Sequence, residues 1–368
     1  MRIGVPKEIK DDENRVGVTP AGVSAFTAHG HEVLVEAGAG AGSHISDEAY
    51  EQAGARIFGN ADALWNEAQM VLKVKEPLPA EYPRMREGLI VFTYLHLAAS
   101  EPLTRELLDR RIVGIAYETV ELDDGTLPLL QPMSEVAGCL AVQAGQRSLE
   151  MHCGGKGILL PGVSGVRRGR VTIVGAGVAG FNACRIAAGL GADVTILDIN
   201  PQRLAYVRDI YHGHVTTLMS NRANIEESVR GADLVIGSVL VAGARAPKLI
   251  TRDMLRQMEP RSALVDIAVD QGGCAETSRP TTHHDPRYLE EDVVHYAVAN
   301  MPGAVPQTST HALTNATLGF ALQIANKGWQ KAARENSALA RGVNCVEGEL
   351  TYQAVAEAFE LPLAELSL

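Results

Sequence analysis

Polar residues follow apolar segments of the chain at five positions, and their types suit proton transfer. Lys75 follows MVLKV, His96 follows LIVFTYL and Glu118 follows IVGIAY. Asp270 follows LVDIAV, and Asn300 follows HYAVA. Ligands of open parallel sheets bind outside the carboxyl ends of the strands, so these side chains lie where a ligand is expected. An ammonium, an imidazole and carboxylates at such a place are the groups of general acid–base catalysis.

Each of these residues also has a structural explanation. Lys75 and Glu118 are of types that usually occur as solvated charges in loops. His96, between leucines, is of a type that often forms a hydrogen-bonded core histidine. Asp270 is the stronger candidate, because its segment belongs to the part of the chain for which a nucleotide is expected. The strand-end pattern alone leaves both interpretations open.

The segment VTIVGAGVAG, residues 171–180, joins a β-like run to Gly175, Gly177 and Gly180, and Asp198 closes the next β-like run. A glycine triplet recurs by chance in a chain with 36 glycines, and an ordinary glycine-rich turn is the alternative. The strand, the helical spacing and the acidic residue together favour a βαβ unit that binds a dinucleotide. A carboxylate at Asp198 accepts hydrogen bonds from a ribose hydroxyl and repels a 2′-phosphate, which predicts NAD(H) rather than NADP(H). The acid–base groups would then accompany hydride transfer.

The length of 368 residues favours two domains. Six apolar segments, from Val171 to Ala299, predict a complete nucleotide-binding domain over residues 130–305. Five more strands before it, with helices between them, predict a second α/β domain made of residues 1–129 and 306–368. Expected strands there cover residues 3–5, 32–36, 70–74, 89–94 and 112–117. The predicted fold class is α/β, with two Rossmann-like, doubly wound parallel sheets that flank a central cleft and are linked by long helices.

Helices are expected on either side of the nucleotide-binding domain. One should begin after an N-cap at Ser134, and the tail should form helices from about Ser309 to Arg341 and from Glu347 to Phe359. Residues 152–169, HCGGKGILLPGVSGVRRG, should form one long irregular connector.

The composition excludes several classes of partner. A formal net charge of −11, with Lys and Arg scattered, argues against a nucleic-acid partner. The charged opening MRIGVPKEIKDDENR is unlike a secretory signal, and no apolar run approaches the ~18 residues of a membrane span. Five cysteines without a Cys-x-x-Cys pair indicate free thiols in a reducing compartment. We therefore expect a cytoplasmic protein that does not bind a membrane.

No metal site is predicted from the cysteine and histidine spacing. Cys274, His283 and His284 fit no common zinc pattern, and hydride transfer needs no metal.

Several longer motifs resemble the alanine dehydrogenases and, more distantly, the NAD-binding portion of proton-translocating nicotinamide nucleotide transhydrogenases. In chain order these motifs are RIGVPKEIK with ENRVGVTP, VKEP, TYLHLA, QPMSEVAG, GAGVAG, DIAVDQGG, and VANMPGAVP leading into TSTHALTN. The resemblance covers essentially the whole chain. It implies an NAD-dependent hexamer that interconverts L-alanine with pyruvate and ammonium.

The resemblance also implies roles for individual residues. Arg15 and Lys75 would hold the substrate, His96 and Asp270 would be the catalytic acid–base groups, and Tyr94, Glu118 and Asn300 would complete the pocket. Either His96 or Asp270 would activate the water that attacks the imine. The implied cofactor-binding residues, besides the three glycines, are Ser134, Val178, Ala179, Asp198, Arg203, Ser220, Val239, Leu240, Ile267, Ala268, Val269, Asp270, Arg279, Val298, Ala299, Asn300 and Met301.

The chain departs from some relatives where a carboxylate and a histidine lie one turn apart on the helix after HALTNATLG. Gln323 and Lys327 stand at these positions, so we expect no metal requirement. The alternatives are a transhydrogenase-type NAD(H)-binding subunit, an opine- or saccharopine-type dehydrogenase, and a non-catalytic NAD sensor. A sensor would have little use for the acid–base residues.

Overall fold

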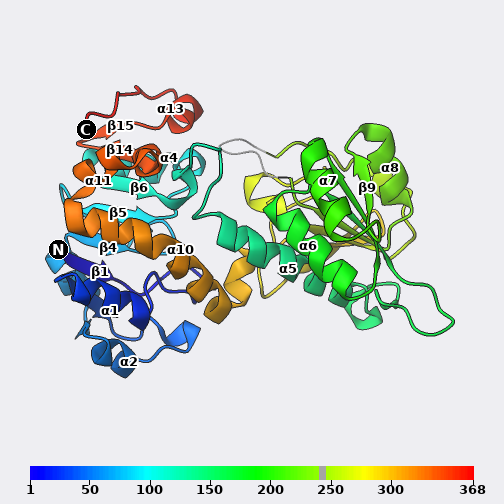
Figure 1. Cartoon of the computed structure of the whole chain (residues 1–368), viewed down its shortest axis with the longest axis horizontal. Coiled ribbons are helices and arrows are strands. Elements are labelled where there is room, and N and C mark those ends of the chain that lie inside the picture. The colour runs from blue at the N-terminus through cyan, green and yellow to red at the C-terminus, as the bar shows by residue number, and fades with distance from the viewer. Residues whose placement is uncertain (240–245) are drawn as a thin grey trace. The chain divides into compact units, whose positions relative to one another are not determined.

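The computed structural model describes residues 1–239 and 246–368, which form two compact units (Figure 1). The first unit comprises Met1–Met133 and Val305–Leu368, and the second comprises Ser134–Ala304. Each unit contains one mostly parallel sheet with helices packed against it. The prediction of two doubly wound α/β folds is confirmed.

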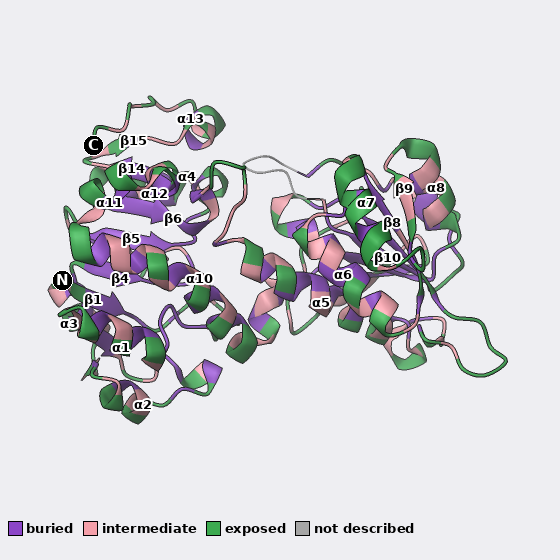
Figure 2. Ribbon diagram, in the orientation of Figure 1, coloured by how far each residue is buried: buried purple, intermediate pink, exposed green. Residues whose placement is uncertain are grey.

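The sheet of the first unit has eight strands in the order β15-β14-β6-β5-β4-β1-β2-β3. Six are parallel: β1 (Arg2–Val5), β2 (Glu32–Glu36), β3 (Arg56–Phe58), β4 (Met70–Leu72), β5 (Ile90–Thr93) and β6 (Val113–Ala116). The last two strands, β14 (Val343–Val346) and β15 (Glu349–Leu350), add an antiparallel edge, since β14 pairs with β6. The central strands are buried, as Figure 2 shows, which explains why they read as continuous apolar runs.

The sheet of the second unit has seven strands in the order β12-β13-β11-β10-β7-β8-β9. The six parallel strands are β7 (Arg170–Val174), β8 (Asp193–Asp198), β9 (Thr216–Met219), β10 (Leu234–Gly237), β11 (Ala263–Asp266) and β13 (Val293–Tyr296). An antiparallel edge strand, β12 (Arg287–Glu290), completes the sheet.

Both sheets reverse their strand order at one point. In each, the first and fourth strands along the chain are neighbours: β1 beside β4, and β7 beside β10. Loops that leave such neighbours diverge to opposite faces of the sheet and leave a crevice at the carboxyl ends, where ligands of this fold class bind. The segment with Arg15 follows β1 and Lys75 follows β4, whereas the glycine-rich loop follows β7.

Helices occupy the connections between strands. Those of the first unit are α1 (Pro20–Ala28), α2 (Asp47–Gln52), α3 (Ala61–Glu67), α4 (Glu101–Asp109), α10 (Pro306–Lys327), α11 (Trp329–Glu335), α12 (Ser337–Gly342) and α13 (Gln353–Phe359). The others are α5 (Gln131–Ser148), α6 (Val178–Gly189), α7 (Pro201–Ile210), α8 (Arg222–Arg230) and α9 (Arg252–Arg256). Side-chain oxygens cap several of them; Thr19 accepts from Gly22 N and Ser100 from Leu103 N.

Three sequence predictions of helix boundaries are wrong. Ser134 is not an N-cap, because α5 already begins at Gln131. The tail is not one helix to Arg341, since Gly328 at φ 78° ends α10 and the Asn336 side chain caps α12. The second predicted helix does not begin at Glu347, because the residues from 343 to 350 form the β14–β15 hairpin, which turns through Glu347 and Gly348, both with positive φ. This helix, α13, begins at Gln353.

Gly180 in α6 offers a test of the packing that supports the glycine-rich loop. A Cβ at Gly180 would lie 1.8 Å from the carbonyl oxygen of Gly175, whereas a Cβ at Gly189 of the same helix would meet nothing within 4 Å. Gly180→Ala should therefore lower the free energy of unfolding by about 3 kcal/mol or more. Gly189→Ala, the matched control, should leave it unchanged or raise it by up to ~1 kcal/mol. Equal urea unfolding midpoints for the two variants would contradict the contact.

Candidate active site and cofactor site

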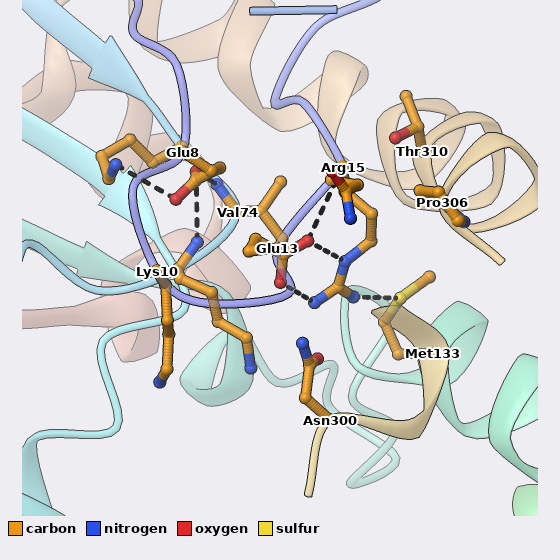
Figure 3. A network of polar contacts seen from close by, with 12 residues as sticks. Glu8, Lys10, Glu13, Arg15, Val74, Met133, Asn300, Pro306 and Thr310 are labelled. Atoms are coloured by element: carbon orange, nitrogen blue, oxygen red, sulfur yellow. Dashed lines mark hydrogen bonds and ion pairs between the residues drawn. The ribbon is translucent and has the colours of Figure 1, made fainter. Parts of the chain in front are cut away.

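Arg15 lies in the segment after β1 and is buried, with 2% of its surface exposed. The carboxylate of Glu13 accepts two hydrogen bonds from the guanidinium, from Nε at 2.7 Å and from Nη2 at 2.6 Å (Figure 3). Nη1 lies 3.0 Å from the sulfur of Met133. The next residue, Val16, donates its N–H to Thr310 Oγ1 of α10 at 3.2 Å. The guanidinium is therefore held at the carboxyl end of the sheet in one orientation.

The charges around Arg15 keep Glu13 ionised. Burial raises the pKa of Glu13, but hydrogen bonds and charge attraction from Arg15, with a contribution from Lys75, outweigh burial and bring the pKa to about 2. Burial lowers the pKa of Arg15, and Glu13 more than compensates. Both groups stay charged throughout the neutral range, so Arg15 is a permanent cation suited to a carboxylate ligand.

Lys75 follows β4, and the Glu8 side chain binds the backbone of this segment. Glu8 Oε1 accepts from Val74 N at 2.6 Å and from Lys75 N at 3.4 Å. Its second oxygen lies 3.1 Å from the Lys73 ammonium, which also binds Glu81 at 2.8 Å. The Glu8 carboxylate links the segment after β1 to the segment after β4, so it fixes the position of the Lys75 backbone.

His96 follows β5 in the left-handed region, with φ 48° and ψ 39°. A non-glycine residue costs roughly 1–3 kcal/mol in such a conformation, and the surrounding structure must enforce it. The Glu118 carboxylate, just after β6, accepts from Leu95 N at 3.2 Å and from His96 N at 2.5 Å. The imidazole stacks on Tyr94 at 5.8 Å, and its side chain is 45% exposed.

Tyr94 itself is buried and 3% exposed. Its hydroxyl donates to the carbonyl of Leu129 at 2.6 Å. Burial raises the pKa of this phenol, so it is neutral at physiological pH. Tyr94 therefore offers the His96 imidazole a fixed, uncharged face.

The glycine-rich loop of the second unit has the conformation that a dinucleotide requires. Gly175 has φ 105°, and Gly180 packs against its carbonyl. A Cβ at Gly177 would approach only Arg203 Nη1, at 3.7 Å, so the backbone there is accessible. Gly177 precedes α6 without a side-chain cap, and the helix N-terminus attracts an anion. A hollow of about 390 Å³ adjoins the loop, lined by Ala176, Gly177, Val178, Phe181, Gln202, Arg203, Tyr206 and Val207.

Asp198 ends β8 with its carboxylate against this loop. Oδ2 accepts from Ala176 N at 2.6 Å, and Oδ1 accepts from Asn200 N at 2.8 Å. Arg203 Nη1 lies 3.9 Å from Oδ2. The carboxylate thus supports the loop, and the remaining lone pairs of its two oxygens are what a ribose would use.

The other predicted cofactor residues are spread over the loops of the same unit. Ser220 follows β9 and donates its N–H to the Asp198 carbonyl at 3.0 Å, and Val239 follows β10. Ser134 lies in α5, and Arg279 covers the Tyr288 ring at 4.0 Å. Leu240 lies outside the described residues. Val178 and Ala179 begin α6, Ile267, Ala268 and Val269 follow β11, and Val298, Ala299 and Met301 follow β13.

Asp270 and Asn300 come together in the second unit. Strand β11 ends at Asp266, earlier than the sequence suggested, because this side chain accepts from Ala268 N at 3.1 Å and starts a 3-10 helix over Ile267–Gln271. Asp270 lies on that turn and is exposed. Its Oδ2 accepts from Asn300 N at 3.3 Å, and Asn300 has φ 63°. The carboxylate and the amide residue therefore share one edge of the sheet.

Comparison with known proteins identifies the family. Residues 4–137 match the family described as "Alanine dehydrogenase/PNT, N-terminal domain", and residues 141–353 match its C-terminal domain. The chain belongs to the alanine dehydrogenase/PNT family. This confirms the resemblance that the sequence motifs indicated.

Individual members of the alanine dehydrogenase/PNT family match over nearly the whole chain. An alanine dehydrogenase of Geobacillus stearothermophilus is 59% identical over 100% of this chain and 98% of its own length. One from Methanococcus maripaludis is 57% identical over 98% and 97%. A solved L-alanine dehydrogenase has a TM-score of 0.94 at 50% identity and covers 98% of this chain and 99% of its own. A transhydrogenase from Sinorhizobium meliloti reaches a TM-score of 0.82 at 25% identity, over 96% and 100%.

Gln323 and Lys327 stand at the two positions where some relatives have a carboxylate and a histidine. Gln323 and Lys327 both lie on α10, where Gln323 Oε1 accepts from Asn336 and Lys327 pairs with Glu335 at 2.6 Å. Burial raises the pKa of the Cys274 thiol to about 12, which disfavours the thiolate that a zinc ligand needs. Glu150, His152 and Cys153 have ligand atoms within 4.8 Å of one another, the one such group among the described residues.

Sequence reasoning missed the residues that hold the predicted site in place. Glu13 lies two residues from Arg15 in ENR, and a carboxylate so close to a buried arginine was a usable signal. Glu8 had no local signal, because its contacts with Lys73 and Val74 join segments more than 60 residues apart.

The low pKa of Glu13 makes a prediction about pH. Its folded-state pKa of about 2 lies below the ordinary 4.5, so the stabilisation is complete above pH ~4.5 and is lost as the pH falls toward 2. Glu13→Gln should lower the free energy of unfolding at pH 7 by about 3 kcal/mol, and the difference from wild type should shrink in acid. Urea unfolding at several pH values measures it. Glu101→Gln, which breaks an exposed pair with Arg105, should cost less than ~0.5 kcal/mol, and a pH-independent Glu13 effect would contradict the assignment.

Proposed function

We propose that this protein catalyses the NAD-dependent, reversible oxidative deamination of L-alanine to pyruvate and ammonium. The observation that carries the proposal is its 59% identity to an alanine dehydrogenase over the full chain. The buried Arg15 and Lys75 and the accessible His96 suit an amino-acid substrate, which needs both carboxylate recognition and proton transfer.

In this proposal the first unit holds the substrate. Arg15 binds the substrate carboxylate, since Glu13 fixes its guanidinium in a single orientation and a fixed fork matches a carboxylate well. Lys75 adds a second positive charge, aligned by the Glu8 bridge to its backbone. Tyr94 completes the pocket within the first unit. Asn300 is assigned to the substrate from the family resemblance, and it lies beside the acid–base residue Asp270 in the second unit.

Acid–base chemistry is assigned to His96 and Asp270. NAD supplies the acceptor for the hydride that leaves the alanine α-carbon. Water then attacks the resulting imine, and deprotonated His96 or Asp270 removes a proton from that water. The same group gives that proton to the nitrogen of the carbinolamine and then takes the proton of the new hydroxyl as the C–N bond breaks, so that ammonia leaves and the carbonyl of pyruvate forms. In the reverse direction protonated His96 stabilises the carbonyl oxygen as it leaves as water.

The second unit is assigned to NAD, and the loop fits the group. The backbone at Gly177 and the N-terminus of α6 would hold the pyrophosphate, and Asp198 would hold the adenosine ribose. The remaining residues assigned to the cofactor are Ser134, Val178, Ala179, Arg203, Ser220, Val239, Leu240, Ile267, Ala268, Val269, Asp270, Arg279, Val298, Ala299, Asn300 and Met301.

Assembly and location are assigned on weaker grounds. We place the protein in the cytoplasm, because its five cysteines are free, as in a reducing compartment. None of the described helices is long and apolar enough to cross a membrane. A homohexamer is proposed from the family resemblance. Leu159, Val163 and Val166 on the irregular connector are each at least 55% exposed, which supports association because exposed apolar side chains favour burial.

Two alternative activities share much of this chemistry. A transhydrogenase-type subunit would exchange hydride between nucleotides, and the structural similarity to the Sinorhizobium protein supports this alternative. An opine- or saccharopine-type dehydrogenase would use a larger amino acid in place of ammonium. The lower identity of the transhydrogenase, 25% against 50% for the L-alanine dehydrogenase, favours the amino-acid reaction.

Oxidation of NADH separates these activities. With pyruvate, turnover should occur with ammonium and not with a larger amino acid or a second nucleotide. His96→Ala and Asp270→Asn should each lower kcat by about a hundredfold or more, while NADH binding stays within about twofold. Turnover without ammonium would refute the reaction, and near-normal kcat in either variant would return that residue to a structural role.

Coenzyme preference tests the role of Asp198. Asp198→Ala combined with Ile199→Arg removes the carboxylate and adds a cation at an exposed position, and it keeps Asn200 as the cap of α7. The ratio of kcat/KM for NADPH to that for NADH should rise by about tenfold or more. Ile199→Arg alone is the control for the added charge. An unchanged ratio in the double variant would exclude Asp198 as the ribose ligand.

A further inference from the structure

We propose that Glu118 is a positioning residue that sets the geometry of His96, and that it does not bind the substrate itself. The inference rests on the proposed catalytic role of His96 and replaces the sequence prediction that Glu118 lines the substrate pocket. It follows from the backbone of His96, the contacts of the Glu118 carboxylate and the anchoring of the turn that carries Glu118.

The backbone of His96 requires an external constraint. Its φ of 48° lies in a region that side chains with a Cβ seldom adopt, and no glycine relieves the turn. Directly afterwards Leu97–Ala99 form a 3-10 turn, and Ser100 caps α4 through Leu103 N. If the His96 backbone left the left-handed region, the imidazole would move, because α4 fixes the segment that follows.

The Glu118 carboxylate supplies that constraint. It accepts from two successive backbone N–H groups, Leu95 N at 3.2 Å and His96 N at 2.5 Å, and Nδ1 of His96 lies 3.8 Å from Oε1. Two N–H groups that donate to one carboxylate fix the peptide planes on both sides of Leu95 only if the acceptor is itself fixed.

The turn that carries Glu118 is rigid for its own reasons. Strands β5 and β6 are paired with Thr93 opposite Ala116, so Leu95 and Glu118, each two residues further on, lie side by side. Thr119, the next residue, donates to Asn344 Oδ1 at 2.7 Å, which ties the turn to β14. Tyr117 before it is fully buried, and its ring lies 5.1 Å from that of Tyr94. The acceptor is thus anchored on both sides.

These contacts assign the carboxylate to the backbone. Both oxygens of Glu118 face N–H groups of the His96 segment, whereas the imidazole extends to solvent with its side chain 45% exposed. The catalytic group and its support are therefore separate residues. His96 contacts the substrate, and Glu118 sets the orientation of the His96 imidazole. A neutral amide at this position would keep one acceptor and turn an NH₂ group toward a backbone donor.

A double-mutant cycle tests the proposal. Glu118→Gln should lower kcat with pyruvate and ammonium by about tenfold or more and leave the KM for NADH unchanged. In the His96→Ala background the same substitution should change kcat by less than about twofold, because the group that it positions is gone. Glu121→Gln, the same change three residues away, is the control and should keep wild-type kcat.

The outcomes separate the possible roles. An equal loss of kcat in both backgrounds, or a raised KM for pyruvate that persists without His96, would show that Glu118 contacts the substrate and would overturn the proposal. Wild-type kcat in Glu118→Gln would also overturn it. Near-normal kcat in His96→Ala alone would instead refute the catalytic role of His96. A crystal structure of folded Glu118→Gln should show His96 outside the left-handed region, and an unchanged φ would contradict the constraint.

Discussion

Buried and half-buried carboxylates that accept backbone N–H groups hold together the carboxyl ends of both sheets. Glu8 binds the segment with Val74, Glu118 binds that with His96, and Asp198 binds the glycine-rich loop at Ala176. In each case the acceptor follows one strand and the donor follows another. Loops that leave parallel strands have no ladder partners of their own, so a side chain must satisfy their N–H groups. The candidate active site depends on these links, because they fix the backbone positions from which its side chains extend.

The buried carboxylates at these strand ends differ in their electrostatic support. Glu13 has a guanidinium against it, and the pKa of this carboxyl falls to about 2 despite burial. Burial dominates at Glu8 and raises its pKa, even though the Lys73 ammonium lies 3.1 Å away. Burial likewise raises the pKa of Asp266, whose partners are neutral N–H and hydroxyl groups. A buried carboxylate is stable only where its hydrogen bonds are complete, so each link tolerates substitution poorly.

The sequence predicted the fold well because parallel strands buried on both faces leave a plain apolar signal. The parallel strands β1, β2, β4, β5 and β6, and those of the nucleotide-binding sheet, were found in this way. Strand β3 and the antiparallel strands β12, β14 and β15 were missed, since these short strands at or next to a sheet edge have no such run. The helix breaks at Gly328 and Asn336 were missed because the apolar spacing continues across them.

The candidate site residues were also found from the sequence, by their place after each strand and by family motifs. Their supports were not, because a contact such as Glu8 to Val74 joins residues 66 positions apart and leaves no trace in either segment. Glu118 illustrates the difference. Its position after β6 predicted that it belongs to the site, but the bond of its carboxylate to the His96 backbone is seen only in the structure.

The first sheet combines segments that lie before and after the second unit in the sequence, and this imposes an order on biosynthesis. Residues 134–304 contain all the strands of the other sheet, whereas β14 can pair with β6 only after these residues have been made. Asn344, which anchors the turn next to Glu118, is made together with β14. In a nascent chain the strands of the second sheet are therefore all present before the support of the His96 segment can form.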